Sequence, residues 1–438
     1  MLKAHFGYTA FREHQFECCT RLLEKQDAML VLATGGGKSI CYWLPTLMQD
    51  GVCVVICPLK SLMTDQVASL KRHNICAKKV VPGVPTANDS EDGAISLQLA
   101  FDCTKTPKHK LVYMTPEMAM KGMQVMSEFH KRHGISLLAV DEAHCISEWG
   151  NDFRNSYREL GRLREVLPGA PCVALTATAN ARVQSDIIES LGLCLNSGDN
   201  LFKGSFNRAN LKLNAMVVRQ LSDSVAIVGS KITAGCSIVY CITCQEVETM
   251  CEQLREHLNE VVAKYHGKME EADKKSAHQA WGSGVARVIV ATNAFGMGID
   301  KPDVRHVVHV GLSGSLSSYF QEIGRAGRDG RDADATLIFT EADANRIRRI
   351  KTQQAQISEE QSRIIQSQIS EMLQYARTSD CKRYMLLDHF GKNPSTHQSS
   401  HQLTRALLAH SNRPLQVKCC IKGQQSRWIV ETVLVVTH

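Results

Sequence analysis

The chain has 438 residues, of which 51 are Lys or Arg and 44 are Asp or Glu, so its formal net charge is +7. This length exceeds what one hydrophobic core normally serves and predicts two large domains plus a smaller appendage. The mild positive charge is compatible with a polyanionic partner but does not demand one. Most of the 17 cysteines lie in apolar contexts, the N-terminus lacks a secretory apolar core, and no apolar run reaches membrane-spanning length. We therefore expect an intracellular, soluble protein with reduced cysteines and no membrane partner.

A segment near the N-terminus combines aromatic residues with a glutamine. Phe11 and Gln15 lie on a predicted helix, and a glutamine amide can recognise an adenine edge through its paired donor and acceptor. An ordinary amphipathic helix explains the aromatic residues equally well. The adenine-binding role of Gln15 is therefore one of two interpretations.

The first strong motif follows the apolar run from Met29 to Ala33. It consists of Thr34, Gly35, Gly36, Gly37, Lys38 and Ser39. We interpret it as a strand, a tight loop and a helix start, in which three glycines let backbone N–H groups converge on a polyphosphate. Lys38 would add a positive charge, and Ser39 would offer a hydroxyl ligand to Mg²⁺. Taken alone, the hexamer also allows a glycine-rich turn with an incidental lysine.

Apolar β-rich runs alternate with helical stretches beyond this loop. The runs are residues 52–57, 111–114 and 137–140, and the helical stretches are residues 62–72 and 116–133. Such alternation predicts a parallel sheet that is covered by helices.

A pair of carboxylates follows the run that ends at Val140. In a parallel sheet, this strand would deliver Asp141 and Glu142 to the edge that carries the glycine-rich loop. Asp141 can hold Mg²⁺ directly or through water, while Glu142 can orient and deprotonate an attacking water. His144 would then be a sensor. Polar residues after a buried strand are often only a loop, but the phosphate loop upstream argues against that alternative.

The next segment crowds aromatic side chains and a cation into one loop. Trp149, Phe153 and Tyr157 accompany Arg154 within nine residues. Exposed aromatic rings beside a cation can form a stacking platform for unpaired bases. Local packing of Trp149 and Phe153 against the sheet is the alternative, and the two interpretations are compatible.

A second series of strands and helices begins near residue 237 and contains no second phosphate loop. Thr292 and Gly296 lie in a glycine-rich loop that is suited to a close approach by a phosphodiester backbone. Arg325 and Arg328 are three residues apart and can reach a γ-phosphate held by the first lobe, as arginine fingers do. A solvated charged helix is the alternative for the two arginines alone.

These segments together resemble the RecQ family of DNA helicases, over roughly residues 6 to 330. The resemblance rests on the segments at residues 11–15, 34–39, 57–66, 113–117, 141–157, 174–179, 290–300 and 321–330. It implies ATP and Mg²⁺ as cofactors, a 3′ to 5′ polarity, and single-stranded and forked DNA as substrates. The DNA-binding and coupling residues that it implies are Ser61, Thr115, His144, Trp149, Phe153, Arg154, Thr292 and Gly296. The chain departs from the family pattern at Glu148, Asn151 and Ala209, and Glu148 places a carboxylate near the expected DNA.

The resemblance also predicts the organisation of the chain. We expect RecA-like lobes at residues 1–204 and 205–342, a helical part of the RecQ zinc-binding region at 343–394, and a divergent tail at 395–438. Cys381 matches the first zinc ligand of that family, but the Cys-x-x-Cys that should follow it is replaced by His397 and His401. We therefore expect an incomplete zinc site and no winged helix, although a site rebuilt from cysteine and histidine is the alternative.

The favoured hypothesis is thus an ATP-dependent 3′ to 5′ DNA helicase of recombination, repair or replication, nuclear in a eukaryote, with DNA repair proteins as partners. Because the zinc module is incomplete, the rival is a DNA-stimulated ATPase or regulatory DNA-binding protein that hydrolyses ATP without unwinding. An RNA helicase of the same superfamily is a further alternative, which the aromatic loop disfavours.

Overall fold

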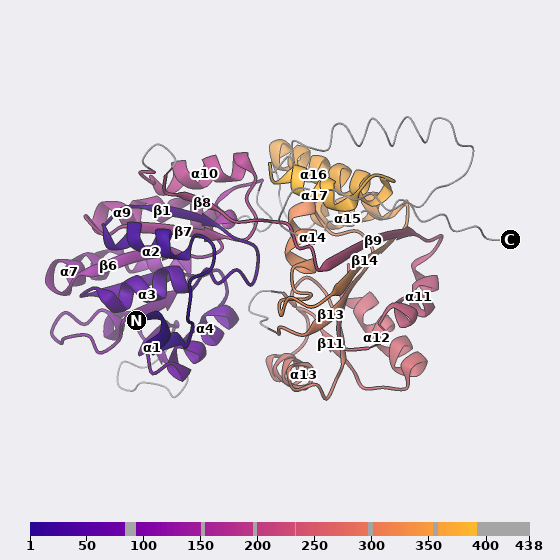
Figure 1. The fold of residues 1–438 in the computed structure, drawn as a ribbon, viewed down its shortest axis with the longest axis horizontal. Helices are drawn as coiled ribbons and strands as arrows, with labels where there is room; N and C mark the ends of the chain where they lie inside the picture. Colours follow the sequence, from indigo (N-terminus) through magenta and orange to yellow (C-terminus); the bar gives the residue numbers. More distant parts are fainter. Residues whose placement is uncertain are drawn as a thin grey trace.

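We describe the protein from a computed structural model that covers residues 1–83, 93–149, 154–195, 199–232, 234–296, 301–353 and 358–391. Two α/β lobes stand side by side, and three further helices lie on the second lobe (Figure 1). Each lobe is built on one sheet in which every strand pairing is parallel. The expected fold class, two parallel-sheet lobes followed by a helical segment, is confirmed.

The first sheet has eight strands in the order β4-β3-β5-β2-β6-β7-β1-β8. Its strands are β1 (Ala28–Val31), β2 (Val52–Ile56), β3 (Ala77–Val80), β4 (Ala94–Ile95), β5 (Leu111–Met114), β6 (Ile135–Val140), β7 (Cys172–Thr176) and β8 (Leu201–Lys203). The central strands are buried along their whole length, as apolar strands of a parallel sheet covered on both faces should be. Because β7 lies between β1 and β6, the carboxyl ends of these three strands meet at one edge.

Helices and short 3₁₀ turns cover this sheet. They are α1 (Leu2–Phe6), α2 (Gln15–Leu23), α3 (Ile40–Met48), α4 (Lys60–Arg72), α5 (Leu97–Ala100), α6 (Pro116–Lys121), α7 (Met123–His133), η1 (Ala143–Ile146), α8 (Asn155–Arg158), η2 (Glu159–Arg162), α9 (Leu163–Val166) and α10 (Ala181–Leu191). The helical stretch expected over residues 116–133 is present as two helices, because Gly122 ends α6 and α7 begins after it. A side chain at position 122 would also collide with Leu97, because a Cβ built on Gly122 would lie 2.9 Å from Leu97 Cδ1.

The second sheet has six strands in the order β11-β12-β10-β13-β14-β9. Its strands are β9 (Leu211–Val217), β10 (Cys236–Cys241), β11 (Val262–Tyr265), β12 (Val288–Ala291), β13 (Val304–Val310) and β14 (Ala333–Phe339). The elements that cover it are η4 (Leu221–Asp223), α11 (Ser224–Lys231), α12 (Cys244–Leu258), α13 (Glu271–Ser283) and α14 (Leu316–Ile323). Strand β8 still belongs to the first sheet, so the crossing between the lobes is confined to residues 204–210.

The C-terminal helices are α15 (Asp343–Gln353), α16 (Glu359–Arg377) and α17 (Lys382–His389). The helical part expected at residues 343–394 thus contains three helices over its described residues. Ile369, Met372 and Tyr375 of α16 are buried, and this helix packs on α14 and β9 (Figure 1). Helix α16 thus docks on the second lobe through one buried face.

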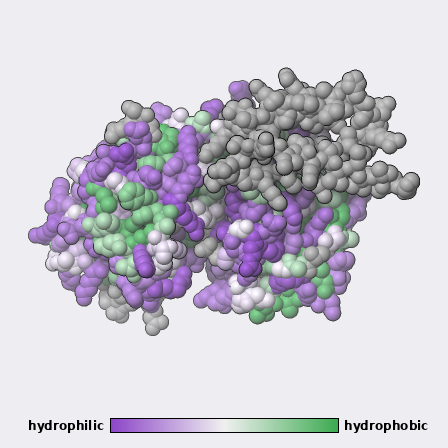
Figure 2. Space-filling model, in the orientation of Figure 1, coloured by the Kyte–Doolittle hydropathy of each residue, from purple (hydrophilic) through white to green (hydrophobic). Residues whose placement is uncertain are grey.

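The visible face of the molecule is mostly hydrophilic, with apolar areas on the first lobe and at the lower edge of the second lobe (Figure 2). Within the parts of the chain that the structure describes, no helix combines the length and apolar character needed to cross a membrane.

Candidate nucleotide site and nucleic-acid interface

The glycine-rich loop joins β1 to α3 with a backbone that requires its glycines. Gly35 and Gly37 have φ angles of +81° and +79°, which glycine adopts without the strain that a Cβ would cause. At Gly36 the reason is space, because a Cβ there would lie 2.9 Å from the Ala33 carbonyl oxygen. The loop therefore exposes backbone where side chains would otherwise block a phosphate.

Lys38 and Ser39 sit at the end of this loop and are engaged by protein groups. Lys38 Nζ donates a hydrogen bond to the Leu32 carbonyl oxygen at 3.1 Å. Burial lowers the pKa of Lys38, and the nearby Glu142 and Asp141 oppose that shift. Ser39 Oγ accepts a 3.4 Å hydrogen bond from Nε2 of Gln66. Gln66 was missed as a site residue, although it belongs to the segment at residues 57–66 that carried the family resemblance.

Gln15 and Arg12 brace the loop from α2 and the residues before it. Gln15 Oε1 accepts from the Arg12 backbone N–H at 2.8 Å, and Gln15 Nε2 donates to the Gly37 carbonyl at 3.0 Å. Arg12 Nη1 donates to the Gly35 carbonyl at 2.6 Å. Recognition of adenine by Gln15 would therefore have to replace hydrogen bonds that already fix the loop.

The two carboxylates follow β6 at the same sheet edge. Asp141 is buried, and its pKa is raised to about 7, first by burial and second by the negative charge of Glu142, while Lys38 lowers it. Glu142 has a φ angle of 50°, a left-handed conformation that costs a non-glycine residue about 1–3 kcal/mol. Such strain is typical of functional sites, since the surrounding structure must impose it.

His144 connects Glu142 to the end of β7. The fully buried ring places Nδ1 3.3 Å from Glu142 Oε2 and 3.0 Å from Thr176 Oγ1. Because none of the side chain reaches the surface, His144 cannot touch a nucleic acid directly. The position of His144 is compatible with the predicted sensor role, in which a movement of residues 176–178 would shift the Glu142 side chain through the His144 ring.

We expect Asp141→Asn to stabilise the metal-free protein by about 1–3 kcal/mol more at pH 8 than at pH 5. The folded-state pKa lies above the ordinary value for aspartate, so this carboxyl favours folding at low pH, and that contribution is lost as the pH rises through about 7. Urea unfolding at both pH values in EDTA measures the difference. An equal gain at pH 5 and pH 8 would contradict the buried-anion explanation.

The loop after the carboxylates is anchored at both of its described ends. Ser147 donates to Asp186 of α10, and Glu148 forms a 2.9 Å ion pair with Arg158 of α8. On the other side, Arg154 Nη1 donates to the Pro58 carbonyl at 2.7 Å. Tyr157, which is buried, donates from its hydroxyl to the Asp141 carbonyl at 3.1 Å. Tyr157 is therefore a packing residue and not part of a stacking surface.

Trp149 is half-buried and packed against other residues. Arg182 lies over the indole ring of Trp149 at 4.0 Å from the centroid. The Trp149 carbonyl accepts a 3.2 Å hydrogen bond from the side chain of Gln368 of α16. Local packing thus accounts for Trp149 in this state, and Arg182 supplies a cation that the sequence pattern did not connect with it. Phe153 lies outside the described residues.

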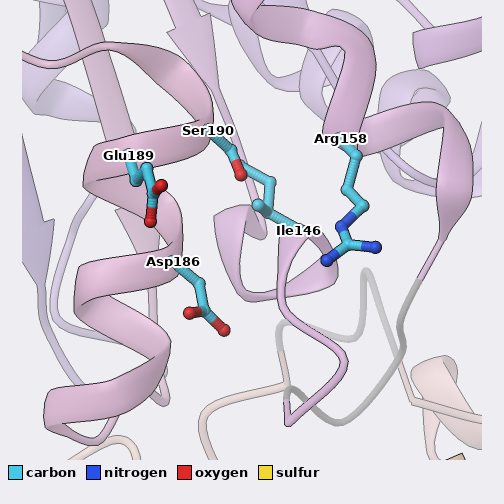
Figure 3. Close-up of a pocket in the computed structure, with 5 residues that line it drawn as sticks. All are labelled: Ile146, Arg158, Asp186, Glu189 and Ser190. Carbon is cyan, nitrogen blue, oxygen red and sulfur yellow. The ribbon is translucent and has the colours of Figure 1, made fainter.

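A separate cavity of about 310 Å³ lies beside this loop. Asp186, Glu189 and Ser190 line it from α10, with Ile146 and Arg158 beside them (Figure 3). The cavity holds both signs of charge and lies outside the nucleotide site.

The second lobe brings Arg328, but not Arg325, against the phosphate loop. Cγ and Cδ of Arg328 lie 3.5 Å from the position of a Cβ on Gly35. The side chain lines a pocket of about 280 Å³ between the lobes, together with residues 32–36 and Arg208. Arg325 is buried inside the second lobe and donates to the Gly296 carbonyl. The two arginines, expected to act together, thus lie in different surroundings.

The other expected DNA contacts have mixed exposure. Ser61 is exposed at the start of α4, whereas Thr115 caps α6 by accepting from the Met118 N–H at 3.4 Å. Thr292 is buried, and its hydroxyl accepts from the Ala294 N–H at 3.4 Å. Gly296 is held by Arg325. Only Ser61 of these four presents an exposed side chain to a ligand.

Cys381 precedes α17 and is half-exposed. Among the described residues, no group of three or more His, Cys, Asp or Glu side chains is arranged to hold a metal ion. His397 and His401 lie outside the described residues. The one Cys-x-x-Cys spacing of the chain, Cys241 to Cys244, joins β10 to α12.

Comparisons with known proteins agree with this geometry. The family described as DEAD/DEAH box helicase matches residues 12–187, the helicase conserved C-terminal domain matches 217–330, and RecQ zinc-binding matches 341–401. The structure of yeast Dbp5 bound to RNA and ADP BeF3 superposes with a TM-score of 0.60 at 17% identity, over 93% of this chain and 96% of that one. At that identity the likeness shows the fold alone.

The relatives found by sequence comparison are more similar to this chain than the superposed structure is. "ATP-dependent DNA helicase RecQ" of Haemophilus influenzae is 37% identical over 90% of this chain and 61% of its own length. "ATP-dependent DNA helicase Q1" of Mus musculus is 37% identical over 89% of this chain and 59% of its own length. The chain thus spans about three fifths of each of these two relatives. Its matches are thus to helicase domains and RecQ zinc-binding, with RecQ-type homologues at 37% identity over most of this chain.

Proposed function

We propose that the protein is an ATP- and Mg²⁺-dependent motor that moves along single-stranded DNA and unwinds forked duplexes with 3′ to 5′ polarity. The observation that carries the proposal is the position of Arg328, which extends from the second lobe onto Gly35 of the phosphate loop. A site shared by two lobes can convert nucleotide binding and release into relative movement. The names of the relatives support DNA as the track.

The residues present fit a Mg²⁺–nucleotide complex. Asp141 and Ser39 offer a carboxylate and a hydroxyl, which are the oxygen donors that Mg²⁺ prefers. When bound, the ion would neutralise charge on the phosphates. Lys38 would hold the phosphates, Glu142 would orient and deprotonate water, and Arg328 would stabilise the charge that develops as the lobes close.

The anchored loop at residues 147–157 provides the coupling to DNA. Its ends are tied to the Asp141 carbonyl and to the segment at Pro58, so a movement caused by a bound strand would reach the carboxylates. The proposed contacts with the DNA bases remain Trp149, Phe153 and Arg154. The proposed contacts along the DNA sugar–phosphate backbone are Ser61, Thr115, Thr292 and Gly296. A bound strand would compete with the packing of Trp149 on Arg182.

We expect Glu148→Gln to change the dissociation constant for single-stranded DNA by less than about twofold. The carboxylate is already balanced by Arg158 at 2.9 Å, so the family departure at this position adds little net charge near DNA. Fluorescence anisotropy with a labelled oligonucleotide measures the affinity. Much tighter binding by the variant would show that the ion pair does not neutralise Glu148.

Parallel ATPase and strand-displacement assays on one preparation test the function. DNA-stimulated hydrolysis with displacement of a 3′-tailed fork supports the motor, and hydrolysis without displacement favours the rival DNA-dependent ATPase. Stimulation of ATP hydrolysis by RNA but not by DNA would indicate an RNA helicase instead.

Imaging the protein in the cells of a eukaryotic source would test the nuclear location, and co-purification would test an association with repair proteins.

A further inference from the structure

The crossing between the lobes holds the backbone of the arginine-finger loop. Arg208 Nη2 donates to the carbonyl oxygens of Ala326 and Gly327 at 2.9 and 2.7 Å, and its Nη1 lies 3.5 Å from that of Gly324. Asn210 Nδ2 also donates to the Gly327 carbonyl, at 2.9 Å. These carbonyls belong to the turn that directly precedes Arg328.

The turn has little freedom to move away from these donors. Gly327 has a φ angle of +59°, and a Cβ there would lie 2.6 Å from Asn210 Nδ2. Burial lowers the pKa of Arg208, with Asp329 opposing the shift. The partly buried guanidinium of Arg208, held among carbonyl oxygens, thus fixes the position of Gly327. The next residue, Arg328, extends from there towards the other lobe.

Helix α17 in turn holds the crossing. Arg383 Nη1 donates to Asn207 Oδ1 at 3.2 Å and to the Arg208 carbonyl, while its Nη2 donates to the Leu211 carbonyl at 2.5 Å. Arg383 therefore binds the side chain of the residue before Arg208 and the backbone carbonyls of Arg208 and Leu211. A continuous chain of contacts runs from α17 through the crossing to the arginine-finger turn.

Helix α17 is docked by aromatic and polar contacts. Phe390 stacks on Phe206 with centroids 4.7 Å apart and lies 4.9 Å from Phe320 of α14. His389 lies 2.8 Å from Ser317 Oγ and 2.7 Å from Glu371 Oε1 of α16. Cys381, the expected zinc ligand, makes none of these contacts.

We propose that Arg208 and Arg383 are positioning residues for ATP hydrolysis, through which the C-terminal helices hold Arg328 against the phosphate loop. The inference rests on the proposed function of Arg328 as the arginine finger. Two guanidinium forks make the chain of contacts, and a lysine ammonium cannot reproduce their planar arrangement of donors. The C-terminal helical module would therefore act on catalysis through the crossing between the lobes.

A double-mutant cycle tests the proposal on the full chain. Single-turnover hydrolysis of radiolabelled ATP at saturating single-stranded DNA is measured for the wild type, Arg383→Ala, Arg328→Ala and the double variant. We expect Arg383→Ala to slow hydrolysis by about 10- to 100-fold in the wild-type background, with KM for ATP nearly unchanged. In the Arg328→Ala background it should have almost no further effect, because the group that it positions is gone.

The matched control is Arg377→Ala, an exposed arginine of the same module whose one ion-pair partner among the described residues is Glu341. It should leave the rate within about twofold of the wild type. If Arg383→Ala proves unstable in thermal unfolding, Arg208→Lys enters the same cycle, with the same non-additive result expected.

Equal slowing by Arg383→Ala in both backgrounds would overturn the inference, since the residue would then act independently of the finger. An unchanged rate in Arg383→Ala would overturn it as well. An unchanged rate in Arg328→Ala would instead refute the finger assignment of the proposed function, so the two failures are distinguishable.

Discussion

Replacing Lys38 with alanine should lower DNA-stimulated ATP hydrolysis by about 100-fold or more, as removal of one preorganised charge-stabilising group does. Lys38 is partly buried near Asp141 and Glu142, and its Nζ is 3.1 Å from the Leu32 carbonyl, at the mouth of the loop that would cradle the phosphates. A steady-state assay of phosphate release with saturating single-stranded DNA measures the loss.

The control for this variant is Lys71→Ala, which removes an exposed lysine at the end of α4. It should retain full turnover, and both variants should bind a labelled oligonucleotide as the wild type does. Turnover that persists in Lys38→Ala would refute the site assignment.

Arg328→Ala should reduce kcat by about 10²- to 10³-fold while ATP still binds. The side chain lies against Gly35 from the other lobe. Under the proposed function, its guanidinium would stabilise charge on the transferring phosphoryl group only when the lobes are together. Fluorescent nucleotide binding and single-turnover hydrolysis, measured together, separate the two steps.

Arg328→Lys should restore only a small part of the rate, because an ammonium lacks the planar fork. Arg331→Ala, an exposed arginine three residues further along, provides the matched control and should behave as the wild type. A variant at Arg328 that loses ATP binding and hydrolysis to the same extent would show that the residue acts in binding rather than in the chemical step.

The sequence predicted the fold class and the sheet edge on which the carboxylates lie because both depend on local patterns. Buried strands followed by polar residues mark the carboxyl ends of parallel strands, and Asp141, Glu142 and the loop at Gly35 meet there. The domain limits at residues 204 and 342, and the roles of the individual site residues, stay predictions.

Contacts between distant residues could not be predicted in the same way. Arg383 and the Leu211 carbonyl are 172 positions apart, and a side chain that binds a backbone oxygen leaves no pattern in the sequence of its acceptor. The packing of Trp149 with Arg182 and Gln368 is another such case, since three separate elements must first fold together. The interruption at Gly122 was missed because α6 and α7 continue the same helical pattern across it.

The hydrogen bonds that Lys38 and Ser39 already make have a consequence for ligand choice. With the Lys38 ammonium on the Leu32 carbonyl and the Ser39 hydroxyl on Gln66, an incoming nucleotide must replace existing hydrogen bonds before it forms its own. Its net affinity is the free energy of the new hydrogen bonds less that of the bonds that they displace. A nucleotide with one phosphate would offer only part of the replacement, so we expect the loop to favour nucleotides with longer phosphate chains.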